Sequence, residues 1–238
     1  MKKKVYIANS VFLSGNFENI PTNRETDKIG SMCTAVLDKL FAGAIKERDV
    51  PIFFASAYSS LKSLHEFNII SEKKGALAVN PSLFPNTVLN APACCASIRH
   101  NIKSPIYNIS NGILSGIDAI VLAYSYLAND KYSNAIICVA EEESVLVELI
   151  EGKKIHNACG ALYLSTKKSD VQITGFFDDQ LQIKPHPIGQ STDTLKIIDH
   201  AIKHGDTNVQ METTKGYVMT ITIHSSKAHL KLAERGQK

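Results

Sequence analysis

The stretch that decides the fold is residues 108–120, which read NISNGILSGIDAI. It follows a short β-prone run, Pro105–Ile109, and its Ser, Asn and Gly residues are the types that tolerate a tight turn. Over Ser115–Ala128 apolar residues then recur at helical spacing and leave almost no polar face. The stretch therefore predicts a strand, a turn and a helix buried in the core.

An isoleucine, Ile113, stands in this turn. The free backbone N–H groups and the positive dipole end of a buried helix point at such a turn, and enzymes use both to lower the pKa of a cysteine and to stabilise an oxyanion. An aliphatic side chain can use neither effect. Whether Ile113 fills the space of a lost acyl group or is simply part of the core, it argues against catalysis at this position.

Three segments carry a family resemblance. Residues 112–120 resemble the active-site turn of the β-ketoacyl synthases of the thiolase superfamily, Ala-Cys-Ser/Thr-Ser-Gly followed by a His/Asp-Ala-Ile helix, and Ile113 falls at the cysteine. Residues 80–105 resemble the family's Pro-Phe-Pro-Asn stretch, with Ser104 in place of the customary glycine, and residues 134–142 resemble the strand ending in Ala-Gly-Gly-Ala-Glu, with both glycines lost. The matches cover roughly residues 1–168 and imply one half of a thiolase-like α/β fold.

The periodicity of the chain agrees with alternating strands and helices. The order is β-α-β-α-β-α-β-β, which predicts a mixed sheet around the buried central helix, with residues 69–84 as a long irregular stretch. The predicted strands are Val5–Leu13, Ile52–Ala57, Pro105–Ile109, Ala135–Ala140 and Gly160–Ser165, and the predicted helices are Thr26–Lys46, Ser59–Phe67, Thr87–His100 and Ser115–Ala128. We expect residues 1–238 to form a single domain, with residues 170–238 packed on it as a small C-terminal extension.

The C-terminal extension is predicted to hold a helix, Thr192–Lys203, with Ser191 as its N-cap and Gly205 as its C-cap. The flanking strands are predicted at Val171–Phe177 and Tyr217–Ile223, followed by a polar tail, Ala228–Lys238, that frays. In condensing enzymes the second half of the fold supplies two histidines in motifs such as His-Gly-Thr-Gly-Thr. These motifs do not occur here, because His204-Gly205 matches only the first two residues.

Composition excludes several classes of protein. The 238 residues are 44% hydrophobic and 21% charged, which is typical of a globular chain with its own core. The net charge of +3 is small, and its one basic run, Lys2–Lys4, reads as a solvated tail, so nucleic-acid binding is not expected. No apolar stretch is long enough to span a bilayer, so membrane insertion is not expected either. The five cysteines are odd in number and lack metal-ligand spacing, and no signal peptide is evident, which predicts the cytoplasm and no metal or other cofactor.

The sequence offers other candidate catalytic groups besides the turn at Ile113. Cys94 and Cys95 lie on a predicted helix of small residues, where adjacent side chains point about 100° apart, so both cannot face one site. A hidden pair of a cysteine with His100 or His156 stays open, because only tertiary folding could form it. The acidic run at residues 141–143 reads as a solvated loop, although the resemblance implies one glutamate there that braces the fold.

The resemblance implies a noncatalytic partner subunit. A Claisen condensation needs a thiolate to hold the acyl chain and donors to stabilise an enolate, and neither is present at the matched positions. In type II polyketide systems one subunit keeps the cysteine while the chain-length factor lacks it, and truncated versions accompany aryl-polyene pathways. We therefore expect a heterodimer with a full-length ketosynthase that elongates fatty-acid-like chains on an acyl carrier protein.

The same resemblance assigns residues to roles. The dimer interface is expected at the strand Ile106, Tyr107, Asn108, Ile109 and Ser110, which would pair across a twofold axis. The acyl tunnel is expected to be lined by Leu83, Phe84, Val88 and Ile113. Two alternatives remain: an active acyltransferase or condensing enzyme that uses Cys94 or Cys95, and a purely structural stabiliser of a synthase.

Overall fold

The computed structural model describes residues 2–15, 17, 27–43, 45–176, 186–205, 208–213 and 218–225. The predicted tail Ala228–Lys238 and the predicted helix start at Thr26 lie outside them. The strands are β1 (Val5–Ser14), β2 (Ile52–Ala55), β3 (Ile106–Ile109), β4 (Asn134–Glu141), β5 (Ala158–Ser165), β6 (Val171–Phe176), β7 (His186–Ile188), β8 (Asn208–Thr213) and β9 (Val218–Ser225). The helices are α1 (Lys28–Phe41), α2 (Leu61–Lys74), α3 (Ala91–His100), α4 (Ser115–Ala128), α5 (Val145–Glu151) and α6 (Asp193–His204), with two short 3₁₀ helices, η1 (Ala76–Ala78) and η2 (Pro81–Thr87).

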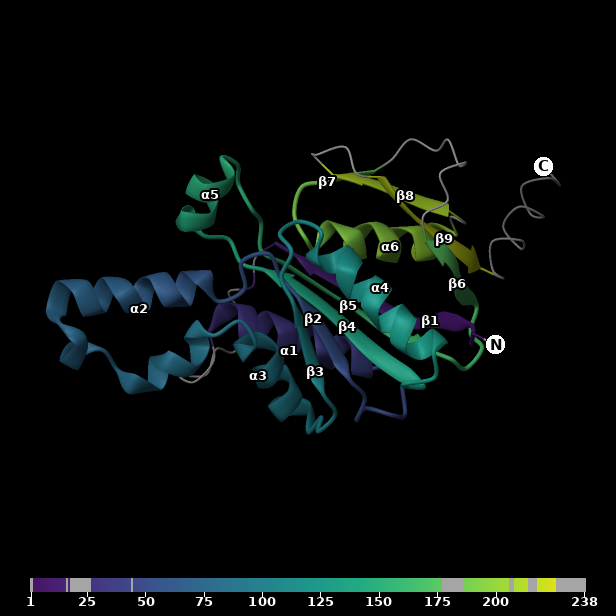
Figure 1. Cartoon of the computed structure of the whole chain (residues 1–238), viewed down its shortest axis with the longest axis horizontal. Helices are drawn as coiled ribbons and strands as arrows, with labels where there is room; N and C mark the ends of the chain where they lie inside the picture. The colour runs from purple at the N-terminus through teal and green to yellow at the C-terminus, as the bar shows by residue number, and fades with distance from the viewer. Residues whose placement is uncertain are drawn as a thin grey trace.

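The described strands form one nine-stranded mixed sheet in the order β3-β2-β4-β5-β1-β6-β9-β8-β7 (Figure 1). Strand β2 is parallel to both β3 and β4, while β4, β5, β1, β6 and β9 follow as antiparallel neighbours. The central strands β2, β4 and β5 are buried along their whole length, as expected for continuous apolar runs covered on both faces. The mixed α/β fold is confirmed, and so is the predicted order of elements from β1 to β4, whereas the unpredicted helix α5 separates β4 from β5.

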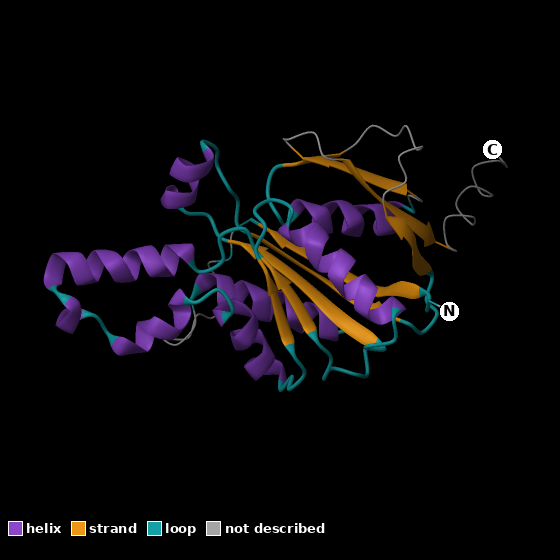
Figure 2. Ribbon diagram, in the orientation of Figure 1, coloured by secondary structure: helices purple, strands orange, loops and turns teal. Residues whose placement is uncertain are grey.

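Helices cover both faces of the sheet (Figure 2). On one face, α4 and α6 pack over a core that includes Phe53, Ile120, Ile137 and Leu195. On the other face, α1 and α3 cover a second core of aliphatic, aromatic and cysteine side chains. Asp27 caps α1, because its carboxylate accepts the backbone N–H of Gly30 at 2.9 Å. The predicted boundaries of α4 are confirmed at both ends.

Several local predictions are wrong. Residues 69–84 are not irregular throughout, because α2 continues to Lys74 before Gly75, with φ +85°, ends it. The first residue outside α6 is Thr192 and not Ser191, whose hydroxyl is used elsewhere. The elements α5, β7 and β8 were not predicted. Gly205 does end α6 in the left-handed conformation, as predicted.

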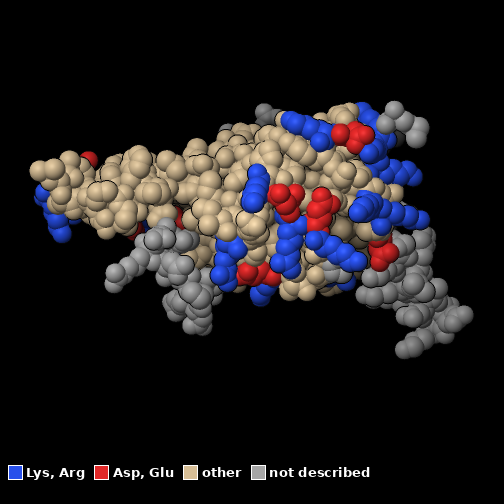
Figure 3. All heavy atoms as spheres, turned by 90° about the horizontal axis from the view of Figure 1, so that it is seen from below, with Lys and Arg blue, Asp and Glu red and all other residues tan. Residues whose placement is uncertain are grey.

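A helical arm leaves the body of the protein at one end of the sheet. It consists of α2, η1 and η2, which run out and back side by side and contact one another (Figure 1). No residue of α2 is buried. On the face seen in Figure 3 the arm shows few charged side chains except near its tip, whereas the body shows many. On that face, the arm therefore presents a largely uncharged surface up to its tip.

Candidate functional site

The candidate site is the turn between β3 and α4. Gly112 has φ +54°, a conformation that glycine adopts without strain. The hydroxyl of Ser115 accepts the backbone N–H of Asn111 at 2.8 Å and donates to the carbonyl oxygen of Gly112 at 2.6 Å. Helix α4 begins at Ser115, immediately after this turn. The predicted strand, turn and helix are thus all in place around Ile113.

Ile113 lies where the resemblance places a nucleophile, close to the start of a largely apolar helix. Its half-buried side chain packs against the core that contains Ile117 and Ile120. The nearest hydroxyl on α4 is that of Ser115, which is fully buried and engaged in the turn. The position therefore offers an aliphatic surface at the helix start, and no group that could hold an acyl chain as a thioester.

A buried carboxylate braces this end of the sheet. Glu141, the last residue of β4, is 1% exposed and accepts hydrogen bonds from the hydroxyls of Ser56 and Ser191 and from the backbone N–H of Ala57. Burial raises its pKa to about 7, although these hydrogen bonds act in the opposite direction. The expectation of a solvated loop is therefore wrong for Glu141, and the brace implied by the resemblance is what the structure contains.

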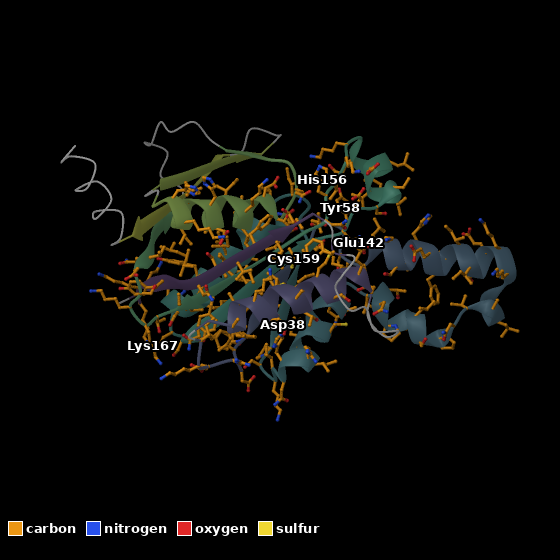
Figure 4. The ribbon with its side chains drawn as sticks, turned by 180° about the vertical axis from the view of Figure 1, so that it is seen from behind. Asp38, Tyr58, Glu142, His156, Cys159 and Lys167 are labelled. Carbon is orange, nitrogen blue, oxygen red and sulfur yellow. The ribbon has the colours of Figure 1, made fainter. Side chains whose placement is uncertain are left out.

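The neighbouring acidic residues differ from one another. Glu142 is 6% exposed and pairs with Lys62 of α2 at 2.7 Å, so it too is not part of a solvated loop. Glu143 does face solvent, and its ion pair with Lys154 lowers its pKa. Tyr58 donates a hydrogen bond to Glu151 of α5, and Figure 4 shows Tyr58 near Glu142 at this end of the sheet. Sequence reasoning missed these contacts because their partners come from segments far apart in the chain.

Of the predicted tunnel residues, Leu83 and Phe84 lie on the arm and Val88 follows it directly. Leu83 is half-buried, while the side chains of Phe84 and Val88 are 59% and 42% exposed. Phe84 meets Phe67 of α2 edge to face, with ring centroids 6.1 Å apart. η2 contacts α2 and α3, whereas Ile113 packs on the core of the body.

The predicted interface strand is an edge strand. Among the strands that the structure describes, β3 has only β2 as a neighbour in the sheet. The N–H groups of Ile52 and Ser56 donate to the carbonyls of Pro105 and Ile109, so alternate residues of the strand face β2. By this alternation the backbone groups of Ile106, Asn108 and Ser110 face the open side, while Tyr107 and Ile109 pair inward.

The alternative nucleophiles, Cys94 and Cys95, lie in surroundings that do not activate a thiol. Cys94 and Cys95 are half-buried on α3, and burial raises the pKa of Cys94, which reduces its thiolate fraction. His100 packs edge to face on Phe41 and His156 is exposed.

Three other cysteines come together in the core between α1 and the sheet. The sulfur atoms of Cys33, Cys138 and Cys159 all lie within 4.8 Å of one another. Spacing along the chain gave no sign of this group, because its members are brought together by a helix and two strands that are distant in sequence.

No family model and no curated protein matches the chain. Solved structures do. The ishigamide ketosynthase/chain length factor shares 13% identity at a TM-score of 0.71, with 89% of this chain and 85% of that chain covered. A ketosynthase in complex with its chain length factor from Xenorhabdus doucetiae shares 12% identity at a TM-score of 0.65, with 86% of this chain and 82% of that chain covered.

A third structure, a type II PKS acyl-carrier protein in complex with its ketosynthase, shares 11% identity at a TM-score of 0.73, covering 94% of this chain and 100% of that chain. In the part of the chain that the structure describes, none of the helices combines the length and apolar character needed to cross a membrane.

The three structural matches show that the chain has the thiolase-like fold of the ketosynthase and chain-length-factor structures.

Proposed function

We propose that this protein is a noncatalytic, chain-length-factor-like subunit that pairs with a full-length ketosynthase. In this role it shapes the acyl tunnel during type II polyketide or aryl-polyene chain elongation on an acyl carrier protein. The proposal places the complex in the cytoplasm and gives this subunit no cofactor. The observation that carries it is Ile113 at the start of α4, in a fold shared with ketosynthase and chain-length-factor structures.

The chemistry of the turn supports a role for this chain as a noncatalytic partner of an enzyme. A condensing site needs a thiolate at the helix start, where the helix dipole and free N–H groups stabilise negative charge. Ile113 occupies that point with a side chain that packs on the core. Cys94 lies on α3 and is a poorer nucleophile because burial raises its pKa. Catalysis is therefore assigned to the partner subunit.

The open edge of β3 supports pairing with a second subunit. Ile106, Asn108 and Ser110 direct their backbone groups away from β2, which leaves donors and acceptors for another strand. An uncovered edge invites aggregation, and closing it in a dimer removes that hazard. Pairing across a twofold axis would join two sheets into one and bring the start of α4 close to the partner's catalytic turn.

The arm supports a role in shaping the tunnel. Phe84, Val88 and Leu89 are each at least 42% exposed, so the chain by itself leaves large apolar side chains in water. Such exposure in a chain of ordinary composition is typical of a surface that a partner covers. We assign Leu83, Phe84 and Val88 to the wall of the partner's tunnel, where side-chain bulk would limit the length of the growing chain.

The test is reconstitution. The chain is co-expressed with an affinity-tagged full-length ketosynthase encoded beside it, and the tagged protein is purified and assayed with malonyl-loaded acyl carrier protein. We expect a stable complex of one copy of each subunit, and elongation only when both are present. A ketosynthase that elongates equally well without this chain, and does not retain it, would refute the proposal.

The same assay separates the two alternatives. An acyltransferase would acquire a covalent acyl mass when the pure chain is incubated with acyl-CoA, and the modified cysteine would be found by peptide mapping. A structural stabiliser would be needed for ketosynthase solubility, while every substitution on the arm would leave product length unchanged. A chain-length factor would remain unmodified and would respond to substitutions on the arm.

A further inference from the structure

The arm is fastened to the body at its base. No residue of α2 is buried, so apolar packing against the core contributes little to the direction of this helix. Just before α2, the hydroxyl of Ser59 donates to the backbone carbonyl of Leu89 at 2.9 Å. The hydroxyl of Ser60 donates to the carbonyl of Val88, directly after η2, at 3.0 Å. The outgoing and returning ends of the arm are therefore held together.

An ion pair joins the first turn of α2 to the sheet. Nζ of Lys62 lies 2.7 Å from Oε1 of Glu142, the residue that follows β4, and Figure 4 shows Glu142 where the arm meets the body. The side chain of Glu142 is 5% exposed, whereas that of Lys62 is 38% exposed. Burial raises the pKa of Glu142, and the ammonium of Lys62 acts in the opposite direction. A carboxylate buried to this degree needs its counter-charge, so Lys62 is held against the end of the sheet.

A second contact restrains the same turn of α2. The hydroxyl of Ser63 donates to Oδ2 of Asp27 at 2.9 Å, while Oδ1 of Asp27 accepts the backbone N–H of Gly30 at the start of α1. Lys62 and Ser63 are consecutive residues, so their side chains point about 100° apart around the helix. Contacts on two sides of one turn fix the direction of a helix as well as its position.

The backbone that leads into α2 is strained and is linked to the turn at Ile113. Ser59 has φ +42°, a left-handed conformation that is costly for a residue other than glycine. Its N–H donates to the hydroxyl of Ser56 at 2.7 Å, and this hydroxyl donates in turn to Glu141. The carbonyl oxygen of Ser56 lies 3.4 Å from the hydroxyl of Ser115 at the start of α4. The base of the arm is therefore connected to the turn that holds Ile113.

We propose that Lys62 and Glu142 are positioning residues: their ion pair sets the direction of the arm, and through it the depth of the acyl tunnel in the complex with the ketosynthase. This inference rests on the proposed function, in which the arm forms part of the tunnel wall. Neither residue touches the acyl chain. Both act through Phe84, which lies on the returning limb of the arm and meets Phe67 of α2 edge to face.

The length of the arm converts a small rotation at its base into a change of tunnel depth. Phe67 lies six residues beyond Leu61, the first residue of α2, which is about 9 Å along the helix axis. A rotation of about 15° at the base therefore moves the contact between Phe67 and Phe84 by about 2 Å. Two carbon–carbon bonds of an extended chain span about 2.5 Å, so this movement is close to one elongation step.

The direction of the arm is measured on the full chain alone. Nitroxide labels are placed on Leu77→Cys at the arm tip and on Lys196→Cys of α6, two exposed positions, in a background that carries Cys94→Ala and Cys95→Ala. The other three cysteines are at most 1% exposed and do not react with the label. Pulsed electron paramagnetic resonance should give one narrow distribution of distances between the labels. Lys62→Met should broaden that distribution or shift its mean by at least about 2 Å, and Lys62→Arg should restore it.

A second variant separates loss of the ion pair from loss of the fold. Lys62→Met leaves the carboxylate of Glu142 without its counter-charge, which can unfold the chain. Glu142→Gln has nearly the same shape and no buried charge, and it should change the distances to the same extent. The matched control is Lys154→Met, which breaks the more exposed ion pair with Glu143 and should leave the distances unchanged.

The reconstituted pair gives the functional readout. Glu142→Gln and Lys62→Met should change the length of the products by at least one two-carbon unit, and Lys62→Arg should give the wild-type products. Affinity for the ketosynthase should stay within about twofold of wild type, because β3 is not altered. A merely structural role of the ion pair would lower the amount of complex without changing the products that each complex makes.

The outcomes are distinct. Unchanged distance distributions in both Lys62→Met and Glu142→Gln would overturn the positioning role. Altered distances with unchanged product lengths would overturn the link between the ion pair and the tunnel. A wild-type chain that does not pair with the ketosynthase refutes the proposed function instead, and the distance measurement then decides by itself whether the ion pair directs the arm.

Discussion

The hydroxyl of Ser191 donates a hydrogen bond to the buried carboxylate of Glu141, across 50 residues of sequence. Glu141 ends β4, and Ser191 lies in the turn that leads into α6. The same carboxylate holds Ser56 and Ala57, which follow β2. One side chain therefore joins the ends of two strands to the C-terminal part of the chain.

This carboxylate predicts a pH dependence of stability. Burial raises the pKa of Glu141 from 4.5 in the unfolded chain to about 7 in the folded protein. The folded state therefore binds the proton more tightly, and this contribution to stability is present below pH 4.5 and lost as the pH rises through about 7. We expect it to remove roughly 3 kcal/mol over that window. Denaturant unfolding of wild type and Glu141→Gln at several pH values gives the free energy of unfolding as a function of pH. The contribution of Glu141 is the difference between the slopes of the two curves.

The control is Glu143→Gln, which removes an acid two residues away whose pKa is lowered by Lys154 and not raised by burial. That variant should keep the wild-type fall in stability between the two pH values. Parallel pH profiles for wild type and Glu141→Gln would show that Glu141 does not titrate in this range.

Gly116→Ala should destabilise the protein by about 1–3 kcal/mol, the usual cost of overpacking. A Cβ at Gly116 would overlap the backbone carbonyl oxygen of Ser191 and press on Thr194, so α4 could no longer approach the turn before α6. Thermal or urea unfolding measures the loss. Ser125→Ala, at a partly exposed position of the same helix, should change stability by less than about 0.5 kcal/mol, and an equal effect of the two would rule out the packing argument.

Asn108→Pro should block pairing with the ketosynthase while leaving the chain folded. The backbone N–H of Asn108 faces the open edge of β3, so proline removes a donor that the β2 ladder does not use. We expect affinity for the ketosynthase to fall at least about tenfold, or about 1.4 kcal/mol. Co-purification measures the pair, and far-UV circular dichroism checks the fold.

Asn108→Ala, which keeps the backbone N–H, should pair as wild type does. Undiminished pairing by Asn108→Pro would mean that β3 is not the interface strand.

Leu83→Ala and Phe84→Ala should lengthen the products of the reconstituted pair by one or more two-carbon units, because smaller side chains deepen the tunnel. Mass spectrometry of the chains released from the carrier protein gives the distribution. Leu149→Ala, on the exposed face of α5, is the matched control and should leave that distribution unchanged. An unaltered distribution in both arm variants would remove these residues from the tunnel.

The pure chain should gain no acyl mass when incubated with acyl-CoA, since Ile113 cannot react and burial raises the pKa of Cys94. Intact-protein mass spectrometry at neutral pH is the measurement. The affinity-tagged ketosynthase serves as the positive control under the same conditions. A stoichiometric acyl adduct on Cys94 or Cys95 would instead support the acyltransferase alternative.

Much of the fold followed from periodicity. The helix Ser115–Ala128 and the strands β1 to β6 were predicted within a few residues, because the apolar residues of these segments indicate their secondary structure locally. The arm was harder. α2 has no buried residue and only a weak apolar stripe, so its second half looked irregular in the sequence. Elements stabilised by few buried contacts leave a faint sequence signal.

In the candidate site too, local features could be predicted and contacts between distant segments could not. The turn, its position before a buried helix and the presence of Ile113 could all be predicted, since they occupy one continuous segment. The burial of Glu141 could not be predicted, because its hydrogen-bond partners Ser56 and Ser191 lie far away in the chain. The three-thiol group was invisible for the same reason.

The sequence alone determined the mixed α/β order and the aliphatic residue at the helix start, because local propensity and side-chain chemistry are properties of short segments. Only the tertiary structure decided which distant groups share a buried environment: Glu141 with Ser191, Gly116 with the turn before α6, and Cys33 with Cys138 and Cys159. Burial and proximity change a side chain's pKa and its hydrogen-bond partners, and both depend on strand register and helix packing that link segments across the whole chain.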